Sequence, residues 1–177
     1  LALALGGTLE EYWPIFAIEA GLPRYAPGLL LAVLCSAQAV ASFMAHRFVD
    51  WSSRAVFAAF TGCGAGLLLA AWTLHPVTIV LVVLFVFVFQ AIDVVYDARL
   101  QAAIPSEYRA TASSVKGFFS EVGGIPVVMA MGLAVTGRSY QVGFEVFGAT
   151  IALVGVIYLL SAGRLPRPEV PVSEADE

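Results

Sequence analysis

The chain has 177 residues, of which 60% are hydrophobic and only 12% are charged, and its mean hydropathy is +0.88. Soluble domains are near half apolar and a quarter charged, so this composition excludes an ordinary soluble protein and indicates an integral membrane protein. The net charge of −4 decides little, because orientation in a membrane follows the placement of Lys and Arg.

Six apolar segments reach the roughly 20 residues that an α-helix needs to cross a bilayer. In chain order, the predicted helices are 1–20, 27–48, 55–74, 77–100, 113–136 and 142–162. The fourth is rich in Val, Ile and Phe, but its length and its lack of turn residues favour a helix over a strand. We therefore predict an all-α membrane protein, with one six-helix transmembrane domain over 1–163 and a disordered cytoplasmic tail over 164–177.

Small residues predict where helices meet. They recur at four-residue spacing in the third helix, at Ala58, Gly62 and Gly66, and pair at Gly123 and Gly124 in the fifth. In lipid, small side chains let helix backbones approach closely. We expect helix contact faces at both places.

Basic residues favour one side of the membrane. Only Arg24 and Arg138 lie on the side of the odd connections, whereas the even connections and the C-terminus carry Arg47, Arg54, Arg99, Arg109, Lys116, Arg164 and Arg167. The positive-inside rule therefore predicts that the even connections and the C-terminus are cytoplasmic.

The first and fourth helices share a pattern. Each carries paired acids beside aromatic residues, in "LEEYWP" and "IDVVYDAR", and each is followed by two plainer helices. A three-plus-three repeat, in which corresponding helices line a transport pathway, gives such a pattern.

The connection "IPSEYRATASSV" places Pro105, Glu107 and Arg109 in an order that resembles the loop between helices ten and eleven of major facilitator superfamily transporters. The segment "MAHRFVDWSSR" resembles the family's loop between helices eight and nine, whose motif is G-x-x-x-D-R-x-G-R. Arg47 matches the arginine of that motif, whereas His46 stands at the acid. The opening segment "EEYWPIFAIEAGLP" is similar to helix seven of bacterial members.

This resemblance implies the C-terminal half of such a transporter, helices seven to twelve, in a bacterial inner membrane. The chain begins within an apolar segment and without a methionine, so we expect an N-terminal six-helix half upstream. In the family, helices seven and ten border the central cavity. The expected partners are a small-molecule substrate, possible H⁺, the lipid bilayer and the other half.

The fourth predicted helix carries two acids, Asp93 and Asp97, near its inner end. Asp93 lies roughly 24 Å along the helix from Val77, inside a hydrocarbon core about 30 Å thick. A charge there costs several kcal/mol unless it faces a partner or a wet cavity, so its face is predicted to line the pathway. Two explanations stay open for Asp93, a coupling carboxylate or an inner-gate ion pair with Arg99 or Arg109; for Asp97 the ion pair is favoured.

Polar and aromatic side chains on facing helices form the predicted substrate and proton pathway: Glu10, Glu11, Tyr12, Trp13, Gln38, Gln90, Asp93, Tyr96 and Glu121. The predicted inner gate and its loop motifs comprise His46, Arg47, Arg54, Asp97, Arg99, Pro105, Glu107 and Arg109. Removal from water favours a neutral carboxyl, so we expect proton coupling at Glu11 or Glu10, and next at Asp93. For Gln38, a hydrogen bond to a neighbouring helix is favoured over one to the ligand. For Glu121, an ion pair with Lys116 is the alternative to a place in the inner cavity.

The predicted function is transport of a small solute by alternating access, without a metal, an organic cofactor or nucleic acid. The main alternative is a non-transporting interaction or regulatory protein, although such a protein has no need for intramembrane acids on facing helices. An intramembrane phosphotransferase that acts on CDP-alcohols needs further aspartates downstream, and none follows Asp97 until Asp176. We therefore predict no enzymatic activity.

Overall fold

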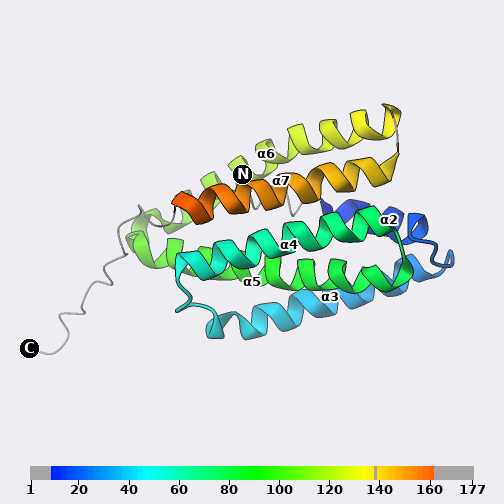
Figure 1. Ribbon diagram of the computed structural model, residues 1–177. Helices are drawn as coiled ribbons and strands as arrows, with labels where there is room; N and C mark the ends of the chain where they lie inside the picture. The colour runs from blue at the N-terminus through cyan, green and yellow to red at the C-terminus, as the bar shows by residue number, and fades with distance from the viewer. Residues whose placement is uncertain (1–8, 138, 162–177) are drawn as a thin grey trace, which may run out of the picture.

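The computed structural model describes residues 9–137 and 139–161, and all its regular elements there are helical (Figure 1). The α-helices are α2 (Trp13–Glu19), α3 (Ala26–Met44), α4 (Ser53–Thr73), α5 (Ile79–Ala103), α6 (Arg109–Gly137) and α7 (Tyr140–Ser161). Single 3-10 turns adjoin them: η1 (Glu10–Tyr12), η2 (Ala45–Arg47), η3 (Pro76–Thr78) and η4 (Ser106–Tyr108). The all-α prediction is confirmed for these residues.

Five helical stretches are long and apolar enough to cross a membrane: Ala26–Arg47, Ser53–Thr73, Pro76–Ala103, Ser106–Thr136 and Tyr140–Ser161. They match the second to sixth predicted helices. Of the first predicted helix, only η1 and α2 fall within the described residues. Residues 1–8 and the predicted tail lie outside them.

The connection before α6 is shorter than predicted. We expected the fifth helix to begin at 113, whereas α6 begins at Arg109. The break is confined to Ile104 and Pro105 and to the turn η4, because the residue before a proline is pushed out of the α region and Ile104 is extended at φ −109° and ψ 132°. Nothing after Pro105 opposes a new helix.

Neighbouring helices contact one another in the order α6, α7, α4, α5, α3, and α2 packs against both α3 and α7 (Figure 1). The most extensive contact joins α4 to α7. The described polar and charged residues are all at least partly exposed, and the buried core consists of apolar side chains. The bundle therefore carries its polar groups on its outer faces and at its ends.

Glycines let α4 and α7 approach closely. A Cβ atom added at Gly148 would lie 2.6 Å from the backbone nitrogen of Leu68, and one at Gly155 would lie 2.9 Å from that of Thr61. A Cβ atom at Gly64 would overlap the backbone of Ala152. These three glycines form the glycine crossing, where even a methyl group has no room.

The predicted contact face of the third helix was wrong. A Cβ atom at Gly62 or Gly66 meets nothing within 4 Å, and Ala58 is exposed. Small residues occur on two faces of this helix, and the glycines of α7 pair with the face that contains Gly64. In the fifth helix Gly124 is buried and Gly123 is partly buried, and the contact face expected there stays a prediction.

Aromatic rings join α2 to α5 and α7. The ring of Trp13 stacks on Phe144 at a centroid distance of 6.1 Å and meets Phe85 edge-on at 5.8 Å. Trp13 is 1% exposed, so its predicted place in the pathway was wrong. The reason is helical periodicity: Trp13, Phe16 and Ala17 share one face of α2, and all are buried.

Candidate functional site

Side-chain contacts between different helices form a band of paired polar residues, which we call the polar row. Its members are Glu10, Gln38, Ser42, Gln90, Asp93, Asp97, Gln101, Ser113 and Lys116. Five of them, Glu10, Gln38, Gln90, Asp93 and Asp97, were predicted pathway or gate residues, and they come from three helical segments. The α5 members recur at i, i+3, i+7 and i+11, so that one face of a single helix presents all of them.

The first pair links η1 to α3. Gln38 Nε2 donates a hydrogen bond of 2.6 Å to Glu10 Oε1. The structure thus brings together two predicted pathway residues, and Gln38 makes the contact with a neighbouring helical segment that was favoured for it. Glu11 is exposed and has no side-chain hydrogen bond within the described part of the chain.

The second pair links α5 to α3. Gln90 Nε2 donates to Ser42 Oγ at 3.1 Å. Ser42 lies one helical turn after Gln38 on α3, so both hydrogen bonds use the same stretch of that helix. Together these bonds connect three helical segments through uncharged donors and one carboxylate.

Lys116 of α6 bridges the two aspartates of α5. Its Nζ lies 3.2 Å from Asp93 Oδ1 and 3.0 Å from Asp97 Oδ1. The aspartates can share one lysine because residues four apart lie on the same face of a helix. With all three groups ionised, two negative charges and one positive charge leave the cluster with an excess of one negative charge.

The ion pair expected at Asp93 and Asp97 therefore exists, but the predicted partners were wrong. Arg99 Nη2 instead donates to two main-chain oxygens of the α3–α4 connection, at 2.7 Å from Val49 O and 2.6 Å from Trp51 O. Arg109 Nε donates to Ile104 O at 3.2 Å. Chain breaks leave carbonyl groups without helical partners, and these attract both guanidinium groups.

The other predicted pathway residues lie outside the polar row. Glu121 is exposed, and the described ion pairs use Lys116 with the aspartates instead of Glu121, so that expected pair was wrong. Tyr12 and Tyr96 are half-buried and pack against the apolar core. The Arg99 guanidinium also lies 5.9 Å from the centre of the Tyr96 ring, within reach of a cation–π contact.

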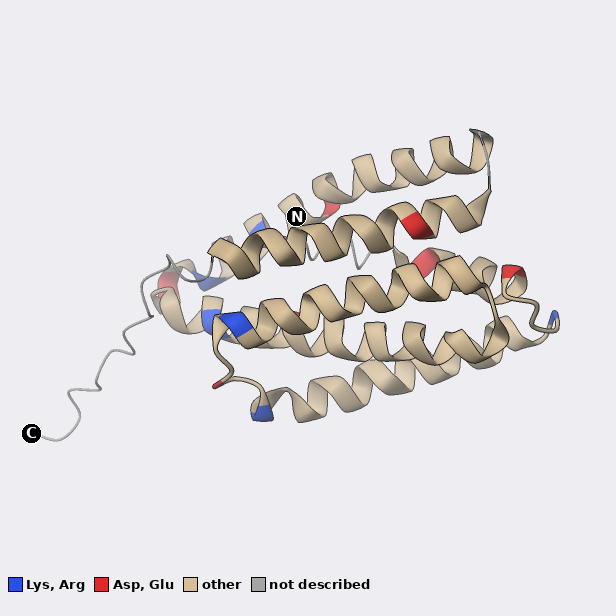
Figure 2. Cartoon of the chain, viewed as in Figure 1, with Lys and Arg blue, Asp and Glu red and all other residues tan. Residues whose placement is uncertain are grey.

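The loop-motif residues lie together at one end of the bundle. His46 Nδ1 is 2.9 Å from Phe43 O, and Pro105 marks the break before α6. The charged side chains of Arg47, Arg54 and Glu107 are exposed. Figure 2 shows most described basic residues at or near this end of the bundle.

Sequence reasoning left Lys116 out of the site, together with Ser42, Gln101 and Ser113. Gln101 Nε2 donates to Ser113 Oγ at 2.7 Å and ties α5 to α6 beyond the lysine. The signal for Lys116 was present, because a lysine inside an apolar helix needs an acidic partner. The serines gave no such signal, since Ser is common in membrane helices.

No family model, curated protein or solved structure matches the chain. Within residues 9–137 and 139–161, no three His, Cys, Asp or Glu side chains lie close enough to hold a metal ion. The site is thus described by its own chemistry: paired amides, one lysine and three carboxylates placed along membrane-compatible helices.

Proposed function

We propose that the chain is the C-terminal half of a secondary active transporter of the major facilitator type. It moves a small solute by alternating access together with a second six-helix half, and protons drive the movement. In this proposal the basic end of the bundle faces the cytoplasm of a bacterial cell, as the distribution of Lys and Arg favours.

The observation that carries the proposal is Lys116 bridging Asp93 and Asp97 between two membrane-compatible helices. Ionisable groups at such depth are expensive and are typical of ion or substrate pathways. A structural ion pair needs one acid for one base, whereas this cluster has one acid more. The additional carboxylate supplies a place for a transported proton.

Protonation of Asp93 or Asp97 would also weaken the contact between α6 and α5. In the described chain α6 packs mainly against α7, and its polar links to α5 are the lysine bridge and the Gln101–Ser113 hydrogen bond. A proton on either aspartate removes one of the two ion pairs of Lys116. The inner end of α6 then separates from α5 more easily, which couples proton uptake to opening on that side.

The test uses the full natural protein in liposomes that contain a pH-sensitive dye. Sugars, amino acids and organic cations are added in turn, and solute-dependent proton movement is recorded. We expect at least one solute to move protons, Asp93→Asn to abolish that movement and Lys116→Gln to reduce it. Glu19→Gln, an exposed acid outside the polar row, is the control.

Glu10→Gln and Glu11→Gln complete the series. Wild-type proton movement in these two variants and in Asp93→Asn would contradict proton coupling through the carboxylates. Failure of the wild-type protein to move any solute would favour the alternative, a non-transporting interaction or regulatory protein.

A further inference from the structure

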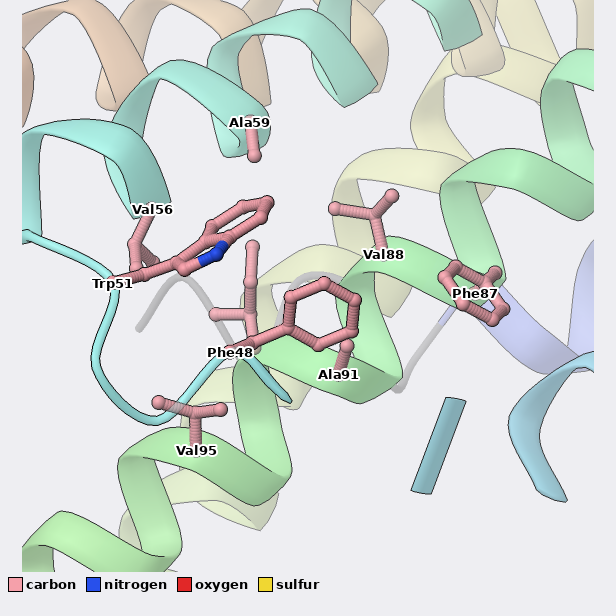
Figure 3. A pocket seen from close by; sticks show the side chains of 9 residues that line it. Phe48, Trp51, Val56, Ala59, Phe87, Val88, Ala91 and Val95 are labelled. Carbon is pink, nitrogen blue, oxygen red and sulfur yellow. The ribbon is translucent and has the colours of Figure 1, made fainter. Parts of the chain in front are cut away.

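The described residues leave an apolar pocket between α4 and α5, under the α3–α4 connection (Figure 3). Val56 and Ala59 contribute from α4, and Ala91 and Val95 from α5. Trp51 from the connection is 41% exposed, so the pocket reaches the molecular surface. Each lining side chain is apolar.

The polypeptide holds the pocket in shape. Phe48 and Trp51 both line it and meet edge to face with ring centres 4.8 Å apart. Arg99 fixes both rings indirectly, because its guanidinium binds the carbonyl groups of Val49 and Trp51. Arg99 is thus a positioning residue for this pocket.

Basic residues flank, in sequence, the two aromatic residues that the connection contributes to the pocket. Arg47 precedes Phe48 and Arg54 follows Trp51, and both arginines are exposed. The described ion pairs involve neither of them. Asp50, which is also exposed, is the one acid of the connection, so with Arg99 the region carries three positive charges against one negative charge.

We propose that the pocket binds a short segment of one acyl chain of an anionic phospholipid, whose phosphate lies between Arg47 and Arg54. Water finds no polar partner in the pocket, and an empty pocket forfeits van der Waals contacts, whereas acyl chains are the apolar groups that a bilayer supplies. Basic residues at the membrane surface select anionic headgroups. The inference goes beyond transport and does not depend on it.

The experiment places the full natural protein in nanodiscs of phosphatidylglycerol and phosphatidylcholine in equal parts. Lipids that remain bound after release into detergent are counted by native mass spectrometry. The expected result is retained phosphatidylglycerol in the wild type and its loss in Ala59→Phe, whose ring fills the pocket. Ala65→Phe, an exposed alanine on the same helix, should retain lipid as the wild type does.

Replacement of the arginines tests the headgroup separately. Arg47→Gln and Arg54→Gln should each lower the preference for phosphatidylglycerol over phosphatidylcholine by about fivefold, while the pocket remains open. Retention of phosphatidylglycerol in Ala59→Phe at the wild-type level would overturn the proposal, as would an unchanged preference in the double arginine variant. If Ala59→Phe fails to fold, Ala91→Leu fills the same pocket with a smaller change.

Discussion

Lys116 is the one described cation that pairs with acids, and it serves two of them. Each side chain of the cluster is about one-third to one-half exposed, so water screens the attraction. The bridge is therefore better suited to changing its state than to holding the fold together. In a dry core, breaking the same ion pairs would be strongly destabilising.

We predict that the Lys116–Asp93 and Lys116–Asp97 pairs each contribute about 0.5–1 kcal/mol, the range of partly screened ion pairs. Double-mutant cycles with Lys116→Met, Asp93→Asn and Asp97→Asn measure this coupling in detergent unfolding. A coupling energy near zero for both pairs would mean that α5 and α6 are not held by charge.

Trp13 carries a second prediction. Trp13→Ala should destabilise the protein by about 3–5 kcal/mol, because a large buried ring leaves a cavity. Trp13→Phe should lose much less, since Trp13 Nε1 has no hydrogen-bond partner among the described atoms and only volume is removed. Thermal unfolding of both variants measures the difference. A pathway role would instead leave stability unchanged in Trp13→Ala.

Among the helices, α4 and α7 form the firmest pair. The glycine crossing brings their backbones together, and Gln141 Nε2 of α7 also donates to Ala71 O at the end of α4, at 3.1 Å. In contrast, α6 exposes most of its apolar side chains, including Phe118 and Phe119. A closely packed pair of helices thus lies next to a helix that makes fewer contacts within the described chain.

The crossing predicts an asymmetry between two glycines. Gly148→Leu should destabilise the protein by several kcal/mol, because its side chain would overlap the backbone of α4. Gly62→Leu, the matched control, meets open space and should be tolerated. Size-exclusion chromatography after heating compares the two variants. Equal loss from both would mean that the face of α4 that contains Gly62 is packed as tightly as the glycine crossing.

For the whole molecule, the basic end predicts orientation. In a background with Cys35→Ser and Cys63→Ser, Arg24→Cys should react with a membrane-impermeant maleimide in intact cells. Arg54→Cys should react only after the membrane is permeabilised. Labelling of only Arg54→Cys in intact cells would mean that the protein has the opposite orientation. Labelling of both variants in intact cells would exclude the proposed topology.

Hydropathy and length were enough to predict five membrane-compatible helices, because each run of apolar residues is decided locally. Hydropathy and length could not predict which helix faces contact one another. Which face of α4 meets a neighbour depends on the glycines of α7, more than eighty residues away along the chain. The partner of Asp93 and Asp97 depends on how α6 approaches α5: the sequence indicates that Lys116 needs an acidic partner, but it does not indicate which acid lies within reach.

The hydrogen bonds of Arg99 to the carbonyl groups of Val49 and Trp51 affect which sequence changes the connection can tolerate. Both acceptors are main-chain carbonyl groups, which every amino acid supplies, so substitutions at those two positions leave the acceptors in place. The α3–α4 connection can therefore drift in sequence while its path is retained, as long as the arginine persists. The side chains at positions 49 and 51 can therefore change while the connection keeps its shape.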